Sequence, residues 1–189
     1  MPGSSSELRT IALNEFATTG YGATSLHRIA EIAGLSKASV LYHFDSKDAL
    51  LEAAVTPAID KMNAILDELA AKPVTKKRRD AFIVQFVDFL LEHRLEIYLF
   101  INQGPSLSEV PVIQRGIGIV QRFSSFFGNA GLNTEERMRF GVALGGAAYL
   151  LVTEPTIGID SDGNDNTREG LIKIVRELLA PVPVSVKED

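Results

Sequence analysis

Apolar residues recur three and four positions apart along most of the chain, which is the spacing of one face of an α-helix. In residues 7–18, Leu8, Ala12 and Phe16 fall on the same side, and Gly20 ends the segment. Alternation of apolar and polar residues, which would indicate strands, is nowhere sustained. The pattern therefore predicts an all-α fold of about nine helices without an internal repeat. Besides 7–18, it places helices at 26–33, 37–43, 46–69, 81–93, 112–127, 134–153 and 166–180.

Three stretches interrupt this pattern. Pro57 lies inside a predicted helix and lacks the N–H of an intrahelical hydrogen bond, so we expect a kink or a break near residues 55–56. Residues 72–79 are expected to form a polar connection between helices. Residues 160–166, rich in Asp and Asn, are expected to form a solvated loop.

The second and third predicted helices are short and are separated by a turn at Gly34. Ala30 and Gly34 are small and four residues apart, which permits two helices to approach closely. The second of these helices keeps Val40 on its apolar side and leaves polar and aromatic residues on the other. This is the plan of a helix-turn-helix, which places one helix in the major groove of DNA. An ordinary helical hairpin with a glycine turn is the alternative.

The residue types suggest how such a unit would contact DNA. Lys37 can reach guanine O6 and N7, and Ser39 can contact a base edge or a phosphate. Ala38 and Leu41 are candidates for contacts with thymine methyl groups. Phosphates are attracted to helix N-termini, where the backbone N–H groups point outward. That argument adds Thr24, Ser25 and Ser36, and also Lys47 at the start of the next helix.

Composition and charge narrow the functional classes. With 46% hydrophobic residues the chain can bury a sizeable core, and its net charge of −5 argues against a protein that coats nucleic acid. The absence of cysteine excludes disulfides and thiolate sites. No signal peptide, no apolar run of about 20 residues, no phosphate loop and no nucleophile motif occurs. We expect a cytoplasmic protein that is not an enzyme and needs neither cofactor nor metal.

The segment 20–47 carries a specific resemblance. Gly20-Tyr-Gly-Ala-Thr-Ser-Leu26, Ile29-Ala30, the run from Ala33 to Phe44 and Ser46-Lys47 resemble the N-terminal domain of the tetracycline-repressor family. Two positions depart from the common pattern, since Ala38 replaces a frequent glycine and Leu41 a frequent tyrosine. The resemblance implies that Tyr42 and His43 contact phosphates. The predicted DNA-binding residues are then Thr24, Ser25, Ser36, Lys37, Ala38, Ser39, Tyr42, His43 and Lys47.

The resemblance also implies a domain organisation. Residues 1–50 would form the helix-turn-helix domain, residues 51–182 a regulatory and dimerisation domain, and residues 183–189 a flexible tail. The function it implies is that of a transcriptional repressor, a homodimer on a palindromic operator that a small, largely apolar effector releases. A helical dimerisation module without DNA binding is the alternative.

Two residue sets follow for the regulatory part. Small residues permit close helix packing. We therefore expect the helix over 134–153 and the apolar face of the last helix to form a four-helix interface between two subunits. The alternative is that these helices pack against each other within a monomer. The predicted interface residues are Gly141, Gly145, Ala148, Tyr149, Leu171, Ile174, Val175 and Leu178. Aromatic residues concentrate in the middle of the chain and line an effector cavity or simply fill the core. The predicted cavity residues are Met62, Phe86, Phe89, His93, Tyr98, Phe123 and Phe127.

Overall fold

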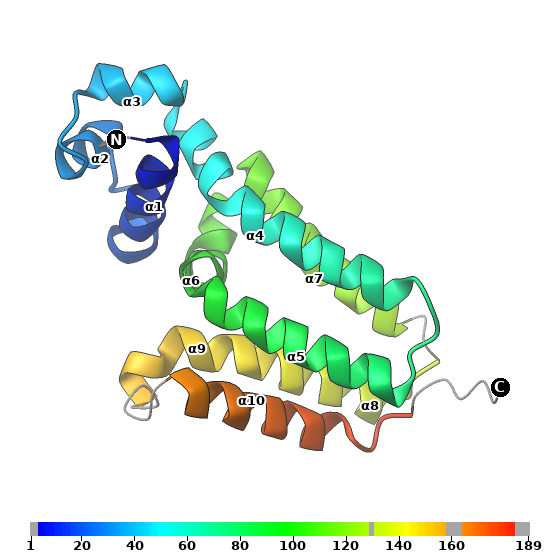
Figure 1. The fold of residues 1–189 in the computed structure, drawn as a ribbon. Helices are drawn as coiled ribbons and strands as arrows, with labels where there is room; N and C mark the ends of the chain where they lie inside the picture. Colours follow the sequence, from blue (N-terminus) through cyan, green and yellow to red (C-terminus); the bar gives the residue numbers. More distant parts are fainter. Residues whose placement is uncertain (1–3, 129–130, 158–163, 184–189) are drawn as a thin grey trace. The chain divides into compact units, whose positions relative to one another are not determined.

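A computed structural model describes residues 4–128, 131–157 and 164–183 of the chain (Figure 1). Over these ranges every regular element is a helix, which confirms the predicted all-α fold. The chain forms two compact units, one from Met1–Asp60 with Leu95–Ile117 and one from Lys61–Arg94 with Gly118–Asp189. The functional boundaries expected at residues 50 and 182 stay predictions.

The first unit contains the N-terminal helices and is held by a continuous apolar core. Its fully buried side chains include Leu8, Phe16, Ile29 and Val40 from the N-terminal helices, and Leu50 from the helix that follows. Its helical elements are α1 (Ser5–Glu15), a π-helical segment (Phe16–Gly20), α2 (Leu26–Ile32), α3 (Lys37–His43), the first half of α4 (Lys47–Ala70), most of α6 (Arg94–Gln103), a 3₁₀ turn (Gly104–Leu107) and the start of α7 (Pro111–Gly128).

The second unit contains the remaining helices, with α5 packed against both α9 and α10. Its own elements are α5 (Lys76–Glu92), α8 (Thr134–Phe140), a π-helical segment (Gly141–Gly145), α9 (Gly146–Ile157) and α10 (Asn164–Leu179). Because the π-helical segment joins α8 to α9 without a break, the described residues form about nine continuous helices, as predicted. Among the described residues, no helix is long and apolar enough to cross a membrane.

The structure corrects several predicted boundaries. Helix α4 runs without a break through Pro57, because proline removes one hydrogen bond while buried side chains on either side, such as Val55 and Ile59, keep the helix packed. Helix α6 was not predicted, since few of its side chains are buried and its apolar periodicity is weak. Helix α9 continues through Pro155 to Ile157. Of the loop predicted at 160–166, residues 160–163 lie outside the described residues, and residues 164–166 belong to α10 instead. Of the tail predicted at 183–189, residues 184–189 also lie outside the described residues.

Residues 76–79 belong to α5 rather than to a connection, because Thr75 caps that helix by accepting a hydrogen bond from the Arg78 backbone N–H. The Arg78 guanidinium donates to carbonyls at the end of α4, including that of Leu69 at 3.3 Å. The Arg79 guanidinium is buried and donates to the carbonyls of Leu179 and Val182, at the end of α10, at 2.8 and 2.7 Å. Two arginines therefore satisfy carbonyls that two helix ends leave open.

Candidate nucleic-acid interface

The turn between α2 and α3 has the geometry of a tight helix-turn-helix. Gly34 adopts a φ of +67°, which side chains disfavour, and the N–H of Leu35 donates to the Ala30 carbonyl at 2.8 Å. A Cβ at Gly34 would meet no atom within 4 Å. Gly34 is therefore needed for its backbone conformation, and not for the close helix approach that the sequence suggested. Ser25 and Ser36 cap α2 and α3 by accepting hydrogen bonds from Arg28 and Ser39.

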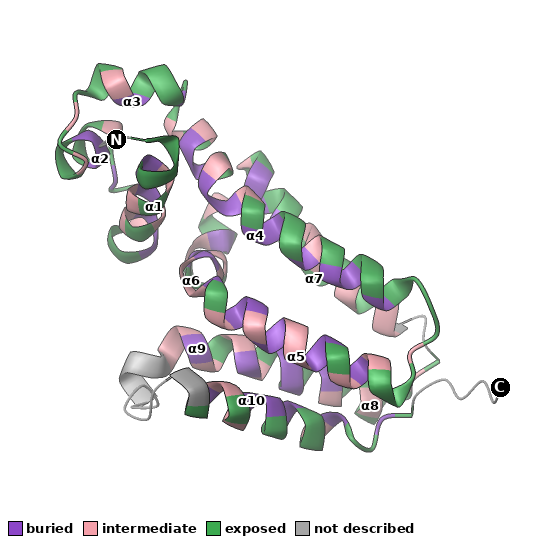
Figure 2. Cartoon of the chain, in the orientation of Figure 1, coloured by how far each residue is buried: buried purple, intermediate pink, exposed green. Residues whose placement is uncertain are grey.

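Helix α3 is exposed along most of its length, with Val40 as its buried anchor (Figure 2). Tyr42 is 86% exposed and Leu41 39% exposed, and Lys37, Ala38 and His43 also lie at the surface. An aromatic ring that is almost fully solvated contributes nothing to the core, so packing within this chain does not account for Tyr42. The structure thus presents most of the predicted contact residues of α3 on its outer side.

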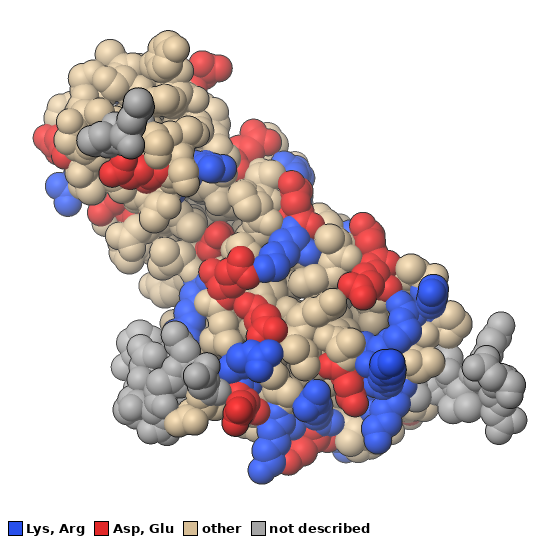
Figure 3. Space-filling model, viewed as in Figure 1, with Lys and Arg blue, Asp and Glu red and all other residues tan. Residues whose placement is uncertain are grey.

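Positive charge at this surface is scarce. Residues 4–50 contain Arg9, Arg28, Lys37 and Lys47, and Arg28 pairs with Glu15 at 3.4 Å. Lys37 is exposed and makes no ion pair with the described residues. On the face that Figure 3 shows, Lys and Arg are sparse over the N-terminal helices and more numerous over α5 and α10. Each copy of this surface can therefore neutralise only a few DNA phosphates.

Thr24 and Lys47 direct their side chains inward, and the prediction that these two helix starts contact phosphates stays a prediction. Thr24 is 2% exposed, and its hydroxyl donates to the Gly20 carbonyl at 2.8 Å. The Lys47 ammonium donates to the carbonyls of Tyr21 and Thr24 at 2.8 and 3.0 Å. These backbone acceptors hold both side chains, so neither is free at the surface. Burial, with a hydrogen bond to Asp48, raises the pKa of the Tyr21 phenol.

A second exposed feature lies on the continuous helix from α8 to α9. Met138, Val142 and Tyr149 are 64%, 62% and 57% exposed, and Gly141 and Gly145 lie at the surface between them. We call these residues, with the 49% exposed Ile174 on the adjoining α10, the apolar stripe. Large exposed apolar side chains at helical spacing mark contact surfaces. Met138 and Val142 were missed by sequence reasoning, although their spacing of four residues was a usable signal.

The stripe agrees only in part with the predicted dimer residues. Gly141, Gly145, Tyr149 and Ile174 are exposed, and Ala148 and Leu178 are half-buried. Leu171 and Val175 are buried within the single chain, so their assignment to a dimer surface is wrong. They lie on the buried side of α10, which packs against α5, α8 and the π-helical segment.

The predicted cavity residues are distributed over both units. Met62, Phe86, Phe89 and His93 are buried in the second unit, while Tyr98 belongs to the first. Several rings pack on one another, with ring centroids 5.8 Å apart for Phe82 and Phe86, and 6.2 Å apart for Phe123 and Phe127. These contacts are those of a filled aromatic core, and a cavity for an effector stays a prediction. No cluster of metal-ligating residues occurs within the described ranges.

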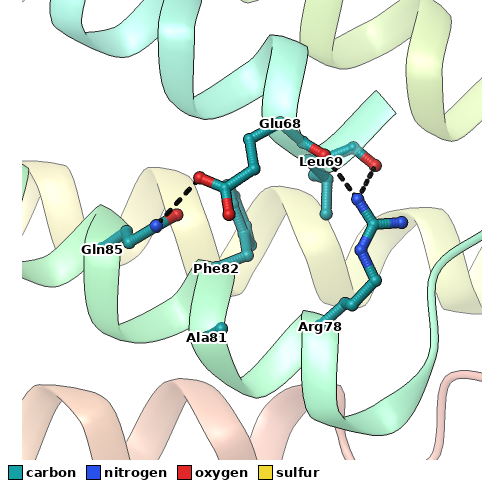
Figure 4. Close-up of a pocket in the computed structure, with 6 residues that line it drawn as sticks. All are labelled: Glu68, Leu69, Arg78, Ala81, Phe82 and Gln85. Atoms are coloured by element: carbon teal, nitrogen blue, oxygen red, sulfur yellow. Dashed lines mark hydrogen bonds between the residues drawn. The ribbon is translucent and has the colours of Figure 1, made fainter. Parts of the chain in front are cut away.

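One shallow recess in the second unit contains none of the predicted cavity residues (Figure 4). It is lined by Glu68, Leu69, Arg78, Ala81, Phe82 and Gln85. Its polar groups are engaged, since Gln85 donates to Glu68 at 3.0 Å and Arg78 donates to the end of α4. Its volume is about 40 Å³. Sites for small molecules usually measure about 300–1,000 Å³, so this recess is too small for an effector.

Comparisons with known proteins place the N-terminal region in a described family. Residues 9–54 match the family described as bacterial regulatory proteins, tetR family. An uncharacterised HTH-type transcriptional regulator of Bacillus subtilis (strain 168) is 35% identical over 93 residues, which are 47% of this chain and 32% of that protein. A negative transcriptional regulator of a biofilm operon in Staphylococcus aureus (strain Newman) is 30% identical over 97 residues, 50% of this chain and 51% of that protein.

The chain thus spans about half, or less, of the length of these curated relatives. Solved structures resemble it over more of its length. A TetR-family regulator from Streptomyces coelicolor A3 matches with a TM-score of 0.68 and 22% identity, over 93% of this chain and 90% of that one. A TetR/AcrR-family regulator from Thermobifida fusca matches with a TM-score of 0.58 and 23% identity, over 95% and 98%. At these identities the likeness is one of fold, and it extends well beyond the region that the family description matches. The match to the tetR family of bacterial regulatory proteins covers residues 9–54, and over the rest of the chain the likeness to regulators of this family is one of fold.

Proposed function

We propose that this protein is a DNA-binding transcriptional repressor that binds a two-fold symmetric operator as a homodimer and is released by a small, largely apolar effector. The observation that carries the proposal is the exposed outer side of α3, where Lys37 and Tyr42 project from a helix anchored by Val40. In a helix-turn-helix this side enters the major groove, where Lys37 meets guanine and Tyr42 a phosphate.

The scarcity of cations supports a dimer. A single copy offers Lys37 as its exposed, unpaired cation within residues 4–50, which is too little charge for tight binding alone. Two linked copies raise the overall affinity, because binding of the second half-site becomes intramolecular. The apolar stripe supplies a surface through which two copies can pair across a two-fold axis.

Repression and effector release are supported by the name of one relative and by the aromatic side chains of the second unit. One relative is named as a negative regulator of a biofilm operon, and that role belongs to that protein. The aromatic side chains around Phe86 and Phe123 provide the apolar surroundings that a largely apolar effector would require. The alternative, a helical dimerisation module without DNA binding, predicts that the isolated protein selects no sequence from a random DNA library.

Replacing Lys37 by alanine is expected to weaken operator binding by about 10- to 100-fold, because a bidentate contact with guanine contributes about 1–3 kcal/mol. The probe is a duplex that the purified protein selects from a random-sequence library, and the measurement is fluorescence anisotropy at fixed salt. Tyr42→Ala should weaken binding to all duplexes alike, because a phosphate contact carries no sequence information.

Lys72→Ala is the matched control, since Lys72 is an exposed lysine outside the helix-turn-helix and its loss changes the net charge equally. It should leave the affinity for the selected duplex within about twofold, as expected of an exposed side chain remote from the contact surface. Undiminished binding by both Lys37→Ala and Tyr42→Ala would refute the assignment of this surface.

Leu41 is expected to read a thymine methyl group. An apolar side chain exposed beside Lys37 is suited to this contact, and burying one methyl contributes about 0.8 kcal/mol, or about fourfold in affinity. Replacing each thymine of the selected duplex in turn by deoxyuridine removes that methyl alone. Wild-type protein should lose about fourfold at one position per half-site, whereas Leu41→Ala should show no loss there. Equal sensitivity of the two proteins at every position would contradict the assignment.

A further inference from the structure

Gln103, the last residue of α6, makes two hydrogen bonds to the main chain of the helix-turn-helix domain. Its side-chain oxygen Oε1 accepts from the Tyr21 N–H at 2.8 Å, and its Nε2 donates to the Phe16 carbonyl at 2.6 Å. More than 80 residues of chain separate Gln103 from these partners, and all three residues belong to the same compact unit. The contact therefore links α6 directly to the N-terminal domain.

The partners of Gln103 lie at a distorted end of a helix. Phe16 begins the π-helical segment that follows α1, and Tyr21 comes directly after it. These two groups are five residues apart, which is the separation that a π-helical turn pairs. The Gln103 carboxamide lies between them and offers the acceptor and the donor that a peptide group would offer. Glutamate cannot supply this donor, and an alkyl side chain supplies neither group.

The same segment also contacts the start of α4. Lys47 donates to the carbonyls of Tyr21 and Thr24, and its Nζ lies 4.2 Å from the centroid of the Tyr21 ring. The Tyr21 hydroxyl donates to Asp48. Residues 16–24 are thus bonded both by the beginning of α4 and by the end of α6. Because Ser25 caps α2 directly after this segment, the position of α2 and α3 depends on both contacts.

We propose that Gln103 is a positioning residue that sets the orientation of the helix-turn-helix relative to α6. In a dimer it would thereby set the separation of the two α3 helices. Lys47 immediately follows the helix-turn-helix in the chain, whereas α6 is separated from it by more than 40 residues, so α6 is linked to it through tertiary contacts such as those of Gln103. The proposal rests on the proposed function, because the separation of two recognition helices matters only for a dimer on two half-sites.

Gln103→Met keeps the approximate length of the side chain and removes both hydrogen bonds. Binding is measured on a selected two-half-site duplex, on versions with one base pair added or removed between the half-sites, and on a single half-site. We expect the variant to bind the full site about tenfold more weakly. Once one subunit is bound, the second helix-turn-helix is no longer held in the correct orientation, so its effective concentration at the second half-site falls. It should also lose most of the wild-type preference for one spacing, while its half-site affinity is unchanged.

Asn102→Ala is the matched control, since the Asn102 side chain donates to the Tyr98 carbonyl one turn back in its own helix. It should keep the wild-type affinity and spacing preference. Gln103→Glu, which retains the acceptor for Tyr21, should recover part of the preference. Amide hydrogen exchange adds a readout that needs no DNA: the Tyr21 amide should exchange about tenfold faster in Gln103→Met than in wild type, as expected when one hydrogen bond of ordinary strength is lost.

Each result separates the two proposals. Wild-type spacing preference in Gln103→Met, or an unchanged exchange rate at Tyr21, would overturn the positioning role. Equal losses on the half-site and the full site would also overturn it, because Gln103 would then merely stabilise the domain. If the wild-type protein bound neither duplex, the proposed function would fail, and the exchange rate at Tyr21 would still test the hydrogen bonds.

Discussion

Arg79→Met should lower the free energy of unfolding by about 2–3 kcal/mol, one of the largest effects expected for a single substitution in this chain. The Arg79 guanidinium is buried and donates to the Leu179 and Val182 carbonyls. Methionine fills a similar volume but leaves both carbonyls at the end of α10 without a donor. The loss is limited because the variant no longer buries a charge.

The measurement is thermal and urea unfolding followed by circular dichroism. A loss of about 2–3 kcal/mol should lower the melting temperature by roughly 5–10 °C in a chain of this size. Lys77→Met, two residues away in the same helical turn, is the control, because Lys77 is exposed and its loss should change stability by less than about 0.5 kcal/mol. Arg79→Lys, which keeps a charged donor, should lie in between. Equal stability of Arg79→Met and Lys77→Met would contradict this account of α10.

Val142→Arg should raise the dissociation constant of the dimer by at least about 100-fold. Val142 is 62% exposed and lies in the middle of the apolar stripe, between Met138 and Tyr149. Across a two-fold axis the same surface meets its copy, so the substitution places a charge on both sides of one apolar contact. Neither guanidinium finds an acidic partner within the stripe.

Sedimentation velocity over a range of protein concentrations measures this effect. Ser125→Arg, which adds the same charge at an exposed position of α7, should leave the association unchanged. Because the proposed operator requires two copies, Val142→Arg should also weaken full-site binding while the single half-site is bound as before. If Val142→Arg associated as strongly as wild type, the stripe would not be the dimer surface.

The local features of this chain were accessible to sequence reasoning because they depend on near neighbours. The spacing of Leu8, Ala12 and Phe16 predicts α1, and Gly34 between two capped segments predicts the helix-turn-helix. Ser25 and Ser36 form the expected caps, since a capping hydrogen bond spans three residues. The outward direction of Lys37 and Tyr42 follows from the same helical periodicity.

Contacts between distant segments were decided by the tertiary structure. Lys47 turns inward because the carbonyls of Tyr21 and Thr24, more than 20 residues earlier, accept its donors. Leu171 is buried on a helix that packs against α5 and α8. The link from Gln103 to Phe16 and Tyr21 has no sequence signal, since a glutamine at a helix end is ordinarily solvated. Sequence periodicity determines which residues share a helix face, whereas the partner of that face depends on how the helices pack.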